Sequence, residues 1–324
     1  MSSRRSFIQT IGAGAAFSIV APAQTTKIFK PHRNMLSTLR IGIIGAENSH
    51  TAGYGKLFNI DKKFPGVEIT HLWGETDEFA RKAADAGKIP AIVKDQKDML
   101  GKIDALIVDH RHAKYHLEAA TPFVKAGIPI FIDKPFCYRV EEGKAFLKLA
   151  RERNTPVSSF SSIAHSDATY DIKKQVEAMP DINHVICHGP VDLDSPYGGI
   201  FFYGIHLIQP LMFIFGDEII KVKISREGKK GNASLVFKNG LFATLIFKNE
   251  AYGWETFVET KKELVQLKSR VPESDPPKMD VDVVNMFRNR VEPRTHESML
   301  KEVAILEALE ASARTLQWEI VKQI

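Results

Sequence analysis

The sequence predicts an α/β protein in two parts: a doubly wound parallel sheet, then an α/β domain with an open, mostly antiparallel sheet. Two patterns support this fold class. Between Leu39 and Phe160, short apolar runs alternate with amphipathic stretches of about ten residues, which is typical of parallel strands joined by helical crossovers. Beyond about residue 165, apolar runs follow one another with few helices between them, which favours antiparallel pairing.

Length and composition set the class of protein. The 324 residues, 44% hydrophobic and 26% charged, are enough for two soluble domains with their own cores. A net charge of +5 is too small to indicate nucleic-acid binding. The two cysteines, Cys137 and Cys187, are predicted to be free buried thiols. No Cys or His spacing indicates metal ligands, so no metal site is predicted.

The N-terminal segment is predicted to be an export signal rather than part of the fold. Arg4 and Arg5 form a twin-arginine pattern, Ile11–Val20 is mildly apolar, and Ala21-Pro22-Ala23 offers a small-residue cleavage site. A membrane anchor is the alternative, but a span needs about 20 apolar residues. Residues 1–34 are therefore assigned to a leader and linker, and the mature protein is expected in the periplasm or otherwise outside the cytoplasm, with no membrane association.

The first domain is assigned to residues 35–160. Six strands in this order suit a nucleotide-binding sheet, whose ligand crevice opens at the carboxyl ends of its strands. Gly127 is placed to end the third helix. The expected strands are Leu39–Ile44, Glu68–Trp73, Ala91–Val93, Ala105–Val108, Pro129–Ile132 and Pro156–Phe160, and the expected helices are Ser49–Asn59, Glu78–Ala86, His116–Ala126 and Val140–Glu152.

The second domain is assigned to residues 161–324, with its last helix expected to pack back toward the first domain. Lys238-Asn239-Gly240 is predicted to join two strands as a hairpin, and Val271–Pro277 is predicted to be a loop. The expected helices are Asp167–Ala178 and Glu297–Arg314, and the expected strands are Ile182–Cys187, Ile219–Ser225, Ala233–Phe237 and Leu241–Phe247.

The turn after the first strand lies where a dinucleotide fingerprint, G-x-G-x-x-G/A, belongs. The fingerprint would start at Gly45, but Glu47 and His50 occupy its second and third glycine positions. A carboxylate 4 Å from a phosphate charge costs about 1 kcal/mol in water and about 4 kcal/mol at an effective dielectric of 20. Either Glu47 points away, or the cofactor binds differently, or it does not bind. Ser49 is a helix N-cap on the alternative interpretation. The candidate cofactor contacts of this segment are Gly42, Gly45, Ala46, Asn48, Ser49 and His50.

Two later strand ends add candidates. Glu75, about 30 residues after Gly45, is placed to hydrogen-bond a ribose diol and would favour NAD over NADP, although a solvated loop glutamate is the alternative. Asp109 and His110 end the fourth strand, and His110 lies nearest to that strand within a run of histidines. A surface histidine cluster is the alternative for that run.

Asp133-Lys134-Pro135 follows the fifth strand, where the crevice opens. The proline prevents helix continuation and fixes the lysine at this point, although a solvated Lys-Pro turn is the alternative. Further along, Gly198-Gly199 opens a turn, and His206 lies on a predicted helix among apolar neighbours. A histidine in such surroundings is more often a core residue.

Together these segments resemble the Gfo/Idh/MocA family of NAD(P)-dependent oxidoreductases, from about Leu39 to Val321. Asp133-Lys134-Pro135 is similar to the family's Glu-Lys-Pro, and Gly204-Ile205-His206 to its Gly-x-His. The first-strand glycines are similar to its Rossmann start, and Glu310–Thr315 to the end of its C-terminal helix. The resemblance implies a Rossmann domain, NAD or NADP as cofactor, a carbohydrate-like substrate, and a homodimer or homotetramer formed through the C-terminal sheet.

The resemblance also implies catalytic roles. Lys134 would lie beside the nicotinamide ribose and the substrate hydroxyl, and His206 would act as acid/base. Phe202 stands where the family has an aspartate, so Tyr203 is a candidate donor in its place. Three functions follow: an exported oxidoreductase acting on a sugar or polyol, a glycosidase or lyase that uses NAD transiently, and a binding protein that keeps the fold without catalysis.

Overall fold

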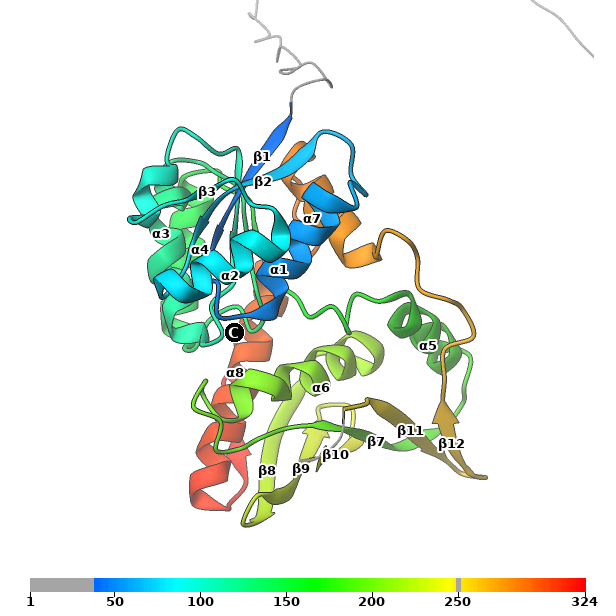
Figure 1. Cartoon of the computed structure of the whole chain (residues 1–324). Coiled ribbons are helices and arrows are strands. Elements are labelled where there is room, and N and C mark those ends of the chain that lie inside the picture. The colour runs from blue at the N-terminus through cyan, green and yellow to red at the C-terminus, as the bar shows by residue number, and fades with distance from the viewer. Residues whose placement is uncertain (1–37, 249–251) are drawn as a thin grey trace, which may run out of the picture. The chain divides into compact units, whose positions relative to one another are not determined.

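The computed structural model describes residues 38–248 and 252–324, so the predicted leader lies outside the described residues. Its first sheet has six parallel strands in the order β3-β2-β1-β4-β5-β6. Figure 1 labels β1, β2 and β3 of this sheet. The order reverses between β1 and β4, and the crevice of a doubly wound sheet lies at such a switch point. The strands are β1 (Leu39–Ile44), β2 (Val67–Trp73), β3 (Ala91–Ile92), β4 (Ala105–Val108), β5 (Ile130–Ile132) and β6 (Val157–Ser158).

Helices cover both faces of this sheet because its strands carry apolar side chains on both sides. Val108 belongs to a core that includes Phe123 and Leu147 on one face, whereas Ile107 belongs to a second core with Phe58 on the other. The helical segments of this domain are α1 (Ser49–Gly55), a π-helical turn (Lys56–Ile60), α2 (Asp77–Gly87), α3 (His116–Lys125) and α4 (Val140–Glu152), with 3₁₀ turns at Gln96–Met99 and Ala113–Tyr115.

The predicted single helix Ser49–Asn59 is wrong in detail, since α-helix gives way to π-helix after Gly55. At this point α1 crosses α2 very closely. A Cβ on Gly55 would lie 2.4 Å from the Cα of Gly87, so only glycine fits. Asn48, not Ser49, is the N-cap, because its side chain accepts from the His50 backbone N–H. The Ser49 cap interpretation is therefore also wrong.

The second sheet has seven strands in the order β12-β11-β7-β10-β9-β8-β13. All its pairs are antiparallel except β7 with β10, which run parallel, so the sheet is mixed and mostly antiparallel. The predicted fold class is thereby confirmed. The predicted hairpin joins β9 to β10, and β11, β12 and β13 were not predicted. The strands are β7 (Ile182–Pro190), β8 (Ile219–Glu227), β9 (Lys230–Phe237), β10 (Phe242–Lys248), β11 (Glu255–Thr260), β12 (Leu264–Leu267) and β13 (Glu319–Ile320).

The remaining helices link the two sheets. α6 and α8 contact each other and the second sheet, and α8 also contacts α4 of the first domain, where Glu307 accepts from the Val140 backbone N–H. α7 was not predicted. Its residues Val283 and Phe287 enter the same core as α1. Among the described residues no helix is long and apolar enough to span a bilayer. These helices are α5 (Asp167–Glu177), α6 (Ile200–Phe215), α7 (Lys278–Asn289) and α8 (His296–Thr315).

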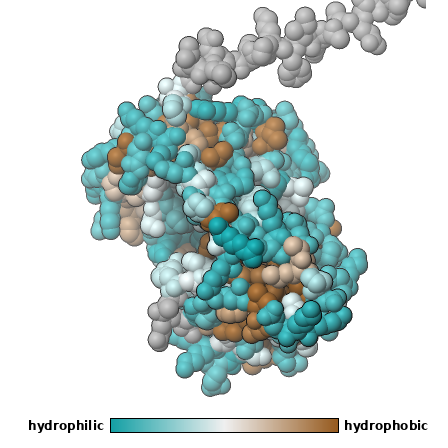
Figure 2. Space-filling model, turned by 90° about the vertical axis from the view of Figure 1, so that its right-hand side faces the viewer, coloured by the Kyte–Doolittle hydropathy of each residue, from teal (hydrophilic) through white to brown (hydrophobic). Residues whose placement is uncertain are grey.

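The surface in the view of Figure 2 is mostly hydrophilic with separate apolar patches. Both cysteines are free and buried, as predicted. Gly127 adopts a φ of +75° just beyond α3, which confirms its predicted place at the end of that helix.

Candidate active site

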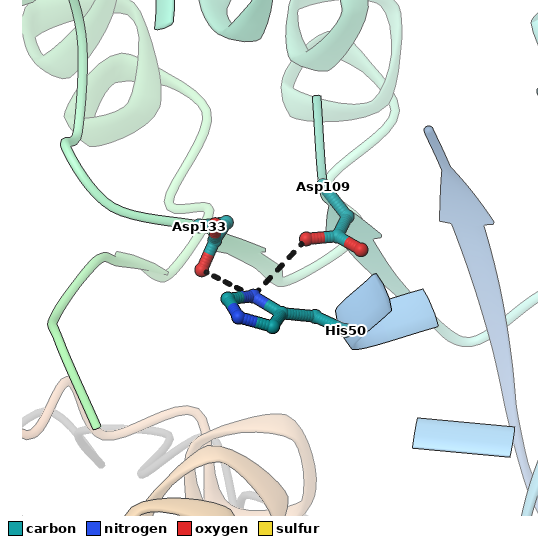
Figure 3. Close-up of side chains that lie close together, drawn as sticks. All are labelled: His50, Asp109 and Asp133. Atoms are coloured by element: carbon teal, nitrogen blue, oxygen red, sulfur yellow. Dashed lines mark ion pairs between the residues drawn. The ribbon is translucent and has the colours of Figure 1, made fainter. Parts of the chain in front are cut away.

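Loops after three strands bring ionisable side chains together at the switch point of the first sheet. His50 lies in the first turn of α1, Asp109 follows β4 and Asp133 follows β5. Figure 3 shows the imidazole ring of His50 directed toward both carboxylates. We call these three residues the His–Asp cluster.

The His–Asp cluster is buried on the sheet side and open on the histidine side. Nδ1 of His50 lies 3.6 Å from Oδ1 of Asp109 and 3.4 Å from Oδ1 of Asp133. The exposed fraction is 0% for the Asp109 side chain, 5% for Asp133 and 43% for His50. Asn48 Nδ2 donates to Asp109 Oδ1 at 2.9 Å and to Asp133 Oδ2 at 3.3 Å. One amide therefore bridges two buried carboxylates.

Burying two carboxylates beside cations shifts the pKa of each group. Attraction to Asp133, supported by Asp109, raises the pKa of His50 to about 10, so its imidazole is charged at neutral pH. Burial raises the pKa of Asp109 to about 6. Burial acts in the same direction on Asp133, but Lys134 and His50 outweigh it and lower the pKa of that carboxyl.

The turn after β1 is held in one conformation by glycine geometry. Gly45 has a φ of +115°, and a Cβ there would lie 2.6 Å from the carbonyl carbon of Asp109. The Thr51 hydroxyl lies 2.8 Å from the Gly45 carbonyl oxygen and 2.6 Å from Asp109 Oδ2. The first glycine of the fingerprint is therefore required where the turn approaches the end of β4.

Glu75 completes the same turn from the end of β2. Its Oε2 accepts from the backbone N–H groups of Ala46 at 2.8 Å and Glu47 at 3.0 Å. Its Oε1 is buried and has no hydrogen-bond partner among the described residues. One carboxylate oxygen of Glu75 is thus anchored and the other is left as an acceptor beside the turn.

The Glu47 side chain points away from the turn. Its Oε1 accepts from the Tyr197 hydroxyl at 2.5 Å and lies 3.9 Å from Arg111 Nη1. Arg111 also donates to the Tyr197 hydroxyl at 3.1 Å and stacks over the Tyr197 ring, 4.3 Å from its centroid. A cation and a hydroxyl therefore hold the carboxylate that the sequence placed in the second glycine position.

Lys134 contacts both the His–Asp cluster and helix α6. Its side chain is 7% exposed, and Nζ lies 3.8 Å from Asp133 Oδ2. Nζ also lies 5.2 Å from the ring centroid of Phe202 and 5.7 Å from that of Tyr203, within cation–π range. The ammonium group is stabilised by a carboxylate from the first domain and by aromatic rings from the second.

His206 is buried next to these rings, and we call Phe202, Tyr203 and His206 the aromatic wall. Nδ1 of His206 lies 2.6 Å from the Ser161 hydroxyl oxygen. Burial first, then the charge of Lys134, lowers the pKa of His206 well below its usual value, so the ring is neutral at neutral pH. The Tyr203 hydroxyl bonds to Tyr252 at 3.0 Å and not to His206, so Ser161, not Tyr203, contacts the histidine.

A cavity of about 240 Å³ opens beside the His–Asp cluster. Asp280 of α7 is 6% exposed there, and no side-chain hydrogen bond to it is found among the described residues. Burial raises the pKa of Asp280 to about 6. The cavity is lined by His50, Gly53, Tyr54, Leu57, Asp133, Lys134, Ser162, Met279 and Asp280. It combines ionisable groups on one side with apolar groups on the other.

Not every sequence candidate reaches this crevice. Gly42 lies inside β1, where a Cβ would lie 2.7 Å from Met99 Sδ, so its role is packing. His110 is buried, and its ring lies 5.8 Å from those of Trp73 and Tyr115. Burial lowers the pKa of His110 to about 3. The candidates that the fold brings together are Gly45, Ala46, Asn48, His50, Glu75, Asp109, Asp133, Lys134, Tyr203 and His206.

Four residues of the site were missed from sequence. Ser161, Tyr197 and Asp280 lie outside every recognised motif, and Arg111 was seen only as part of a histidine run. A signal existed for Asp280 alone: an acidic residue inside the apolar pattern of α7. The others act through contacts with residues far away in the chain, which a local pattern does not reveal.

Comparisons with known proteins agree with this geometry. Residues 39–160 match the family described as "Oxidoreductase family, NAD-binding Rossmann fold". This match to the Gfo/Idh/MocA family covers the first domain of the chain, a little over a third of its length. Inositol 2-dehydrogenase 3 of Saccharopolyspora erythraea is 25% identical to this chain over 203 residues, which are 58% of this chain and 57% of that protein. The match thus spans a little over half of the relative's length.

Solved structures of two inositol dehydrogenases share the fold of this chain. The apo scyllo-inositol dehydrogenase from Lactobacillus casei superposes with a TM-score of 0.73 at 18% identity, covering 88% of this chain and 98% of its own. The myo-inositol dehydrogenase from Lactobacillus casei, in complex with NAD(H) and myo-inositol, gives 0.74 at 14% identity, covering 89% and 98%. At these identities the likeness establishes the fold.

Proposed function

We propose that this protein is an NAD(P)-dependent oxidoreductase that acts on a hydroxyl group of a polyol or sugar, with NAD preferred to NADP. The observation that carries the proposal is Glu75, whose anchored carboxylate leaves Oε1 as a buried acceptor beside the turn after β1. An acidic residue in this place binds the ribose diol of NAD and repels the 2′-phosphate of NADP. The inositol dehydrogenases named above support the class of substrate.

The residues present fit a dinucleotide. Glu75 Oε1 is unpartnered at the ribose end, and Gly45 keeps the turn tight against Asp109. Glu47, the main objection from sequence, has its carboxylate turned to Tyr197 and Arg111. The repulsion expected between Glu47 and a diphosphate is therefore reduced, because Arg111 supplies a compensating positive charge.

The chemistry of the site centres on Lys134 and His206. When bound, the nicotinamide ring would accept the hydride from the carbinol carbon. The Lys134 ammonium is placed to donate a hydrogen bond to the substrate hydroxyl oxygen. Neutral His206 can accept the hydroxyl proton at Nε2 in the tautomer whose Nδ1–H donates to the Ser161 hydroxyl oxygen. The nearby Tyr252 and Trp254 rings supply apolar faces suited to a sugar or cyclitol ring.

The cofactor half of the proposal is tested by calorimetric titration of the full chain with NAD and NADP. We expect Glu75→Gln to weaken NAD binding at least about tenfold and to narrow the preference over NADP, because a charged acceptor is lost. Glu78→Gln, an exposed change in the first turn of α2, is the matched control and should leave both affinities unchanged. If neither NAD nor NADP bound, the proposal would be refuted.

The substrate half is tested by supplying inositols, sugars and sugar acids with NAD and following the absorbance of reduced nicotinamide. Turnover of at least one polyol is expected. Glycoside cleavage without accumulation of reduced nicotinamide would instead assign transient oxidation, the glycosidase or lyase function. Ligand binding without turnover of either kind would assign a non-catalytic binding protein.

We also propose that the chain is exported by the twin-arginine route. The support is the Arg4-Arg5 pattern and the short apolar run after it, both outside the described residues. Cell fractionation of the wild type and of the Arg4→Lys, Arg5→Lys double variant tests this. We expect the wild type in the exported fraction and the variant in the cytoplasm; equal distributions would contradict export by this route.

We further propose a homo-oligomer formed through the open face of the second sheet. On β10, Ala243, Leu245 and Phe247 are buried, so the alternating Ile246 lies on the opposite face, where it is 40% exposed. Light scattering after size exclusion is expected to give a dimer or tetramer that Ile246→Lys weakens. A monomeric wild type would contradict this assignment.

A further inference from the structure

The His–Asp cluster presents one ligand atom from each of its three side chains to a common point. Nδ1 of His50 and one carboxylate oxygen each of Asp109 and Asp133 lie within 4.8 Å of one another. The three come from segments far apart in the chain, on α1 and after β4 and β5, and the sheet order brings them together. The question is whether a hydrogen-bonded ion pair or a bound cation accounts better for this arrangement.

The spacing favours a cation. Charge-assisted N–H···O hydrogen bonds are about 2.7–2.9 Å long, whereas His50 Nδ1 lies 3.6 Å and 3.4 Å from its two carboxylates. One N–H group cannot point at both oxygens. Tetrahedral ligands at bond lengths of about 2.0–2.2 Å lie about 3.3–3.6 Å apart. Both His–Asp distances match the edge of such a tetrahedron.

Each carboxylate is also oriented by side chains outside the His–Asp cluster. Asp109 Oδ2 contacts the Thr51 hydroxyl, and Asp133 Oδ2 contacts Asn48 and Lys134. Oδ1 of each carboxylate faces His50, and Asp109 Oδ1 also accepts from Asn48 Nδ2 at 2.9 Å. Such contacts from outside a metal site orient its ligands. The Asn48 amide is itself fixed, because its Oδ1 accepts from the His50 backbone N–H while its Nδ2 donates to both carboxylates.

The cavity supplies access and an independent sign of a ligand. His50 and Asp133 both line it, so the cluster is open on one side. Asp280 lines the same cavity at 6% exposure without a side-chain hydrogen bond among the described residues. A buried carboxylate without a partner is costly unless something in the cavity compensates it. Three protein ligands with an open side are typical of catalytic rather than structural metal sites.

We propose that His50, Asp109 and Asp133 bind one divalent cation of the Mn²⁺ or Zn²⁺ class, with its open coordination positions facing the cavity. Imidazole with two carboxylates suits this class better than Ca²⁺ or Mg²⁺, which prefer oxygen ligands alone. The site goes beyond the proposed oxidoreductase function, because hydride transfer to a nicotinamide needs no metal ion. The two proposals are therefore tested by separate measurements, metal binding for this site and dinucleotide binding for the oxidoreductase.

The test is titration of the chelator-treated full chain with Mn²⁺, followed by electron paramagnetic resonance, and with Zn²⁺, followed by calorimetry. One ion per chain is expected. His50→Ala and Asp109→Asn should each weaken binding at least about tenfold. His165→Ala is the matched control, because His165 Nδ1 lies 3.7 Å from one carboxylate, Asp282, and no second carboxylate of the described residues completes a triad there. It should leave the affinity unchanged.

A second variant covers the case in which Asp109→Asn does not fold. Thr51→Val keeps the side-chain shape and removes the hydroxyl that contacts Asp109 Oδ2 and the Gly45 carbonyl oxygen. It is expected to weaken binding about tenfold while circular dichroism stays unchanged. No saturable binding of either ion would overturn the proposal. An affinity that neither His50→Ala nor Thr51→Val changes would also overturn it, because the ion would then be an adventitious ion only. NAD titrated into the metal-free chain shows separately whether the oxidoreductase proposal stands.

Discussion

The two sides of Lys134 differ in how they stabilise its charge. On the side of the first domain, the His–Asp cluster places Asp133 Oδ2 3.8 Å from Nζ and holds its carboxylates with Thr51 and Asn48. On the side of the second domain, the aromatic wall offers the Phe202 ring at 5.2 Å and a neutral His206. Ionisable groups that act on the lysine therefore come mainly from the first domain.

The second domain also differs from the family pattern that the sequence resembles. That pattern has an aspartate before the histidine, whereas Phe202 of this chain offers Lys134 only a ring face. His206 then relies on the Ser161 hydroxyl. Lys134 contacts groups of both domains, so its substitution should lower activity more than any other single substitution considered below.

Lys134→Met removes the charge that both sides stabilise while keeping most of the side-chain volume. Under the proposed function we expect kcat/KM for the best polyol to fall at least about 10²-fold, the usual contribution of a proton-handling group. Lys114→Met, at an exposed residue of the Ala113–Tyr115 3₁₀ turn, is the control and should be neutral. Initial rates of nicotinamide reduction measure both. Full activity of Lys134→Met would remove the lysine from the mechanism.

Gly45→Ala tests whether the His–Asp side depends on its tight turn. A Cβ 2.6 Å from the Asp109 carbonyl carbon, at a φ of +115°, should lower the free energy of unfolding by about 3 kcal/mol. Gly53→Ala is the matched change: it lies in α1 with nothing within 4 Å of the new Cβ, and should stabilise by about 1 kcal/mol. Urea unfolding distinguishes them. Effects of the same sign would contradict the turn geometry.

The sequence predicted those parts of the site that are encoded in short, contiguous segments. Lys134 and His206 could be found because each lies in a short motif, and the strands were found because apolar runs are local patterns. The cluster of His50 with Asp109 and Asp133 could not be found, because strand order and not sequence spacing brings the three together. The direction of Glu47 depends on Tyr197, a contact between the two domains.

The same limit explains one strand pairing that the sequence left open and one error in the fold. The parallel pairing of β7 with β10 depends on where β10 inserts into the sheet, and apolar patterning is the same for parallel and antiparallel neighbours. The transition to π-helix after Gly55 depends on its contact with Gly87 in another helix. Both are tertiary effects acting on correctly recognised local elements.

Asp280 and Asp282, two residues apart on α7, allow a matched test of burial near the cluster. Burial raises the pKa of Asp280 in the folded state to about 6, above its ordinary 3.8. The protonated carboxyl therefore favours the folded state at low pH, and this contribution is lost as pH rises from about 4 to 6. Asp280→Asn should therefore stabilise by about 2 kcal/mol at pH 7 and by little at pH 4. Urea unfolding at both values measures this.

Asp282 should behave in the opposite way. Burial opposes its ionisation, but His165 and Lys278 outweigh burial and lower its pKa, so its contribution is present at neutral pH and is lost as pH falls through the folded pKa. Asp282→Asn should destabilise at pH 7. If Asp280→Asn also destabilised the protein at pH 7, the Asp280 carboxylate would have a partner within the protein. It would then no longer support a ligand in the cavity.

The smallest expected effect concerns the aromatic wall itself. The Phe202 ring lies 5.2 Å from both Lys134 Nζ and the guanidinium carbon of Arg111, whereas Phe213, further along α6, lies 5.4 Å from Lys173 Nζ. The Lys134 side chain is 7% exposed and that of Lys173 is 34% exposed. Because cation–π attraction strengthens when the cation loses water, Phe202→Leu should cost about 1 kcal/mol more than Phe213→Leu. Equal losses in urea unfolding would show that the Phe202 ring contributes packing alone, and that Lys134 depends on the first domain for its stabilisation.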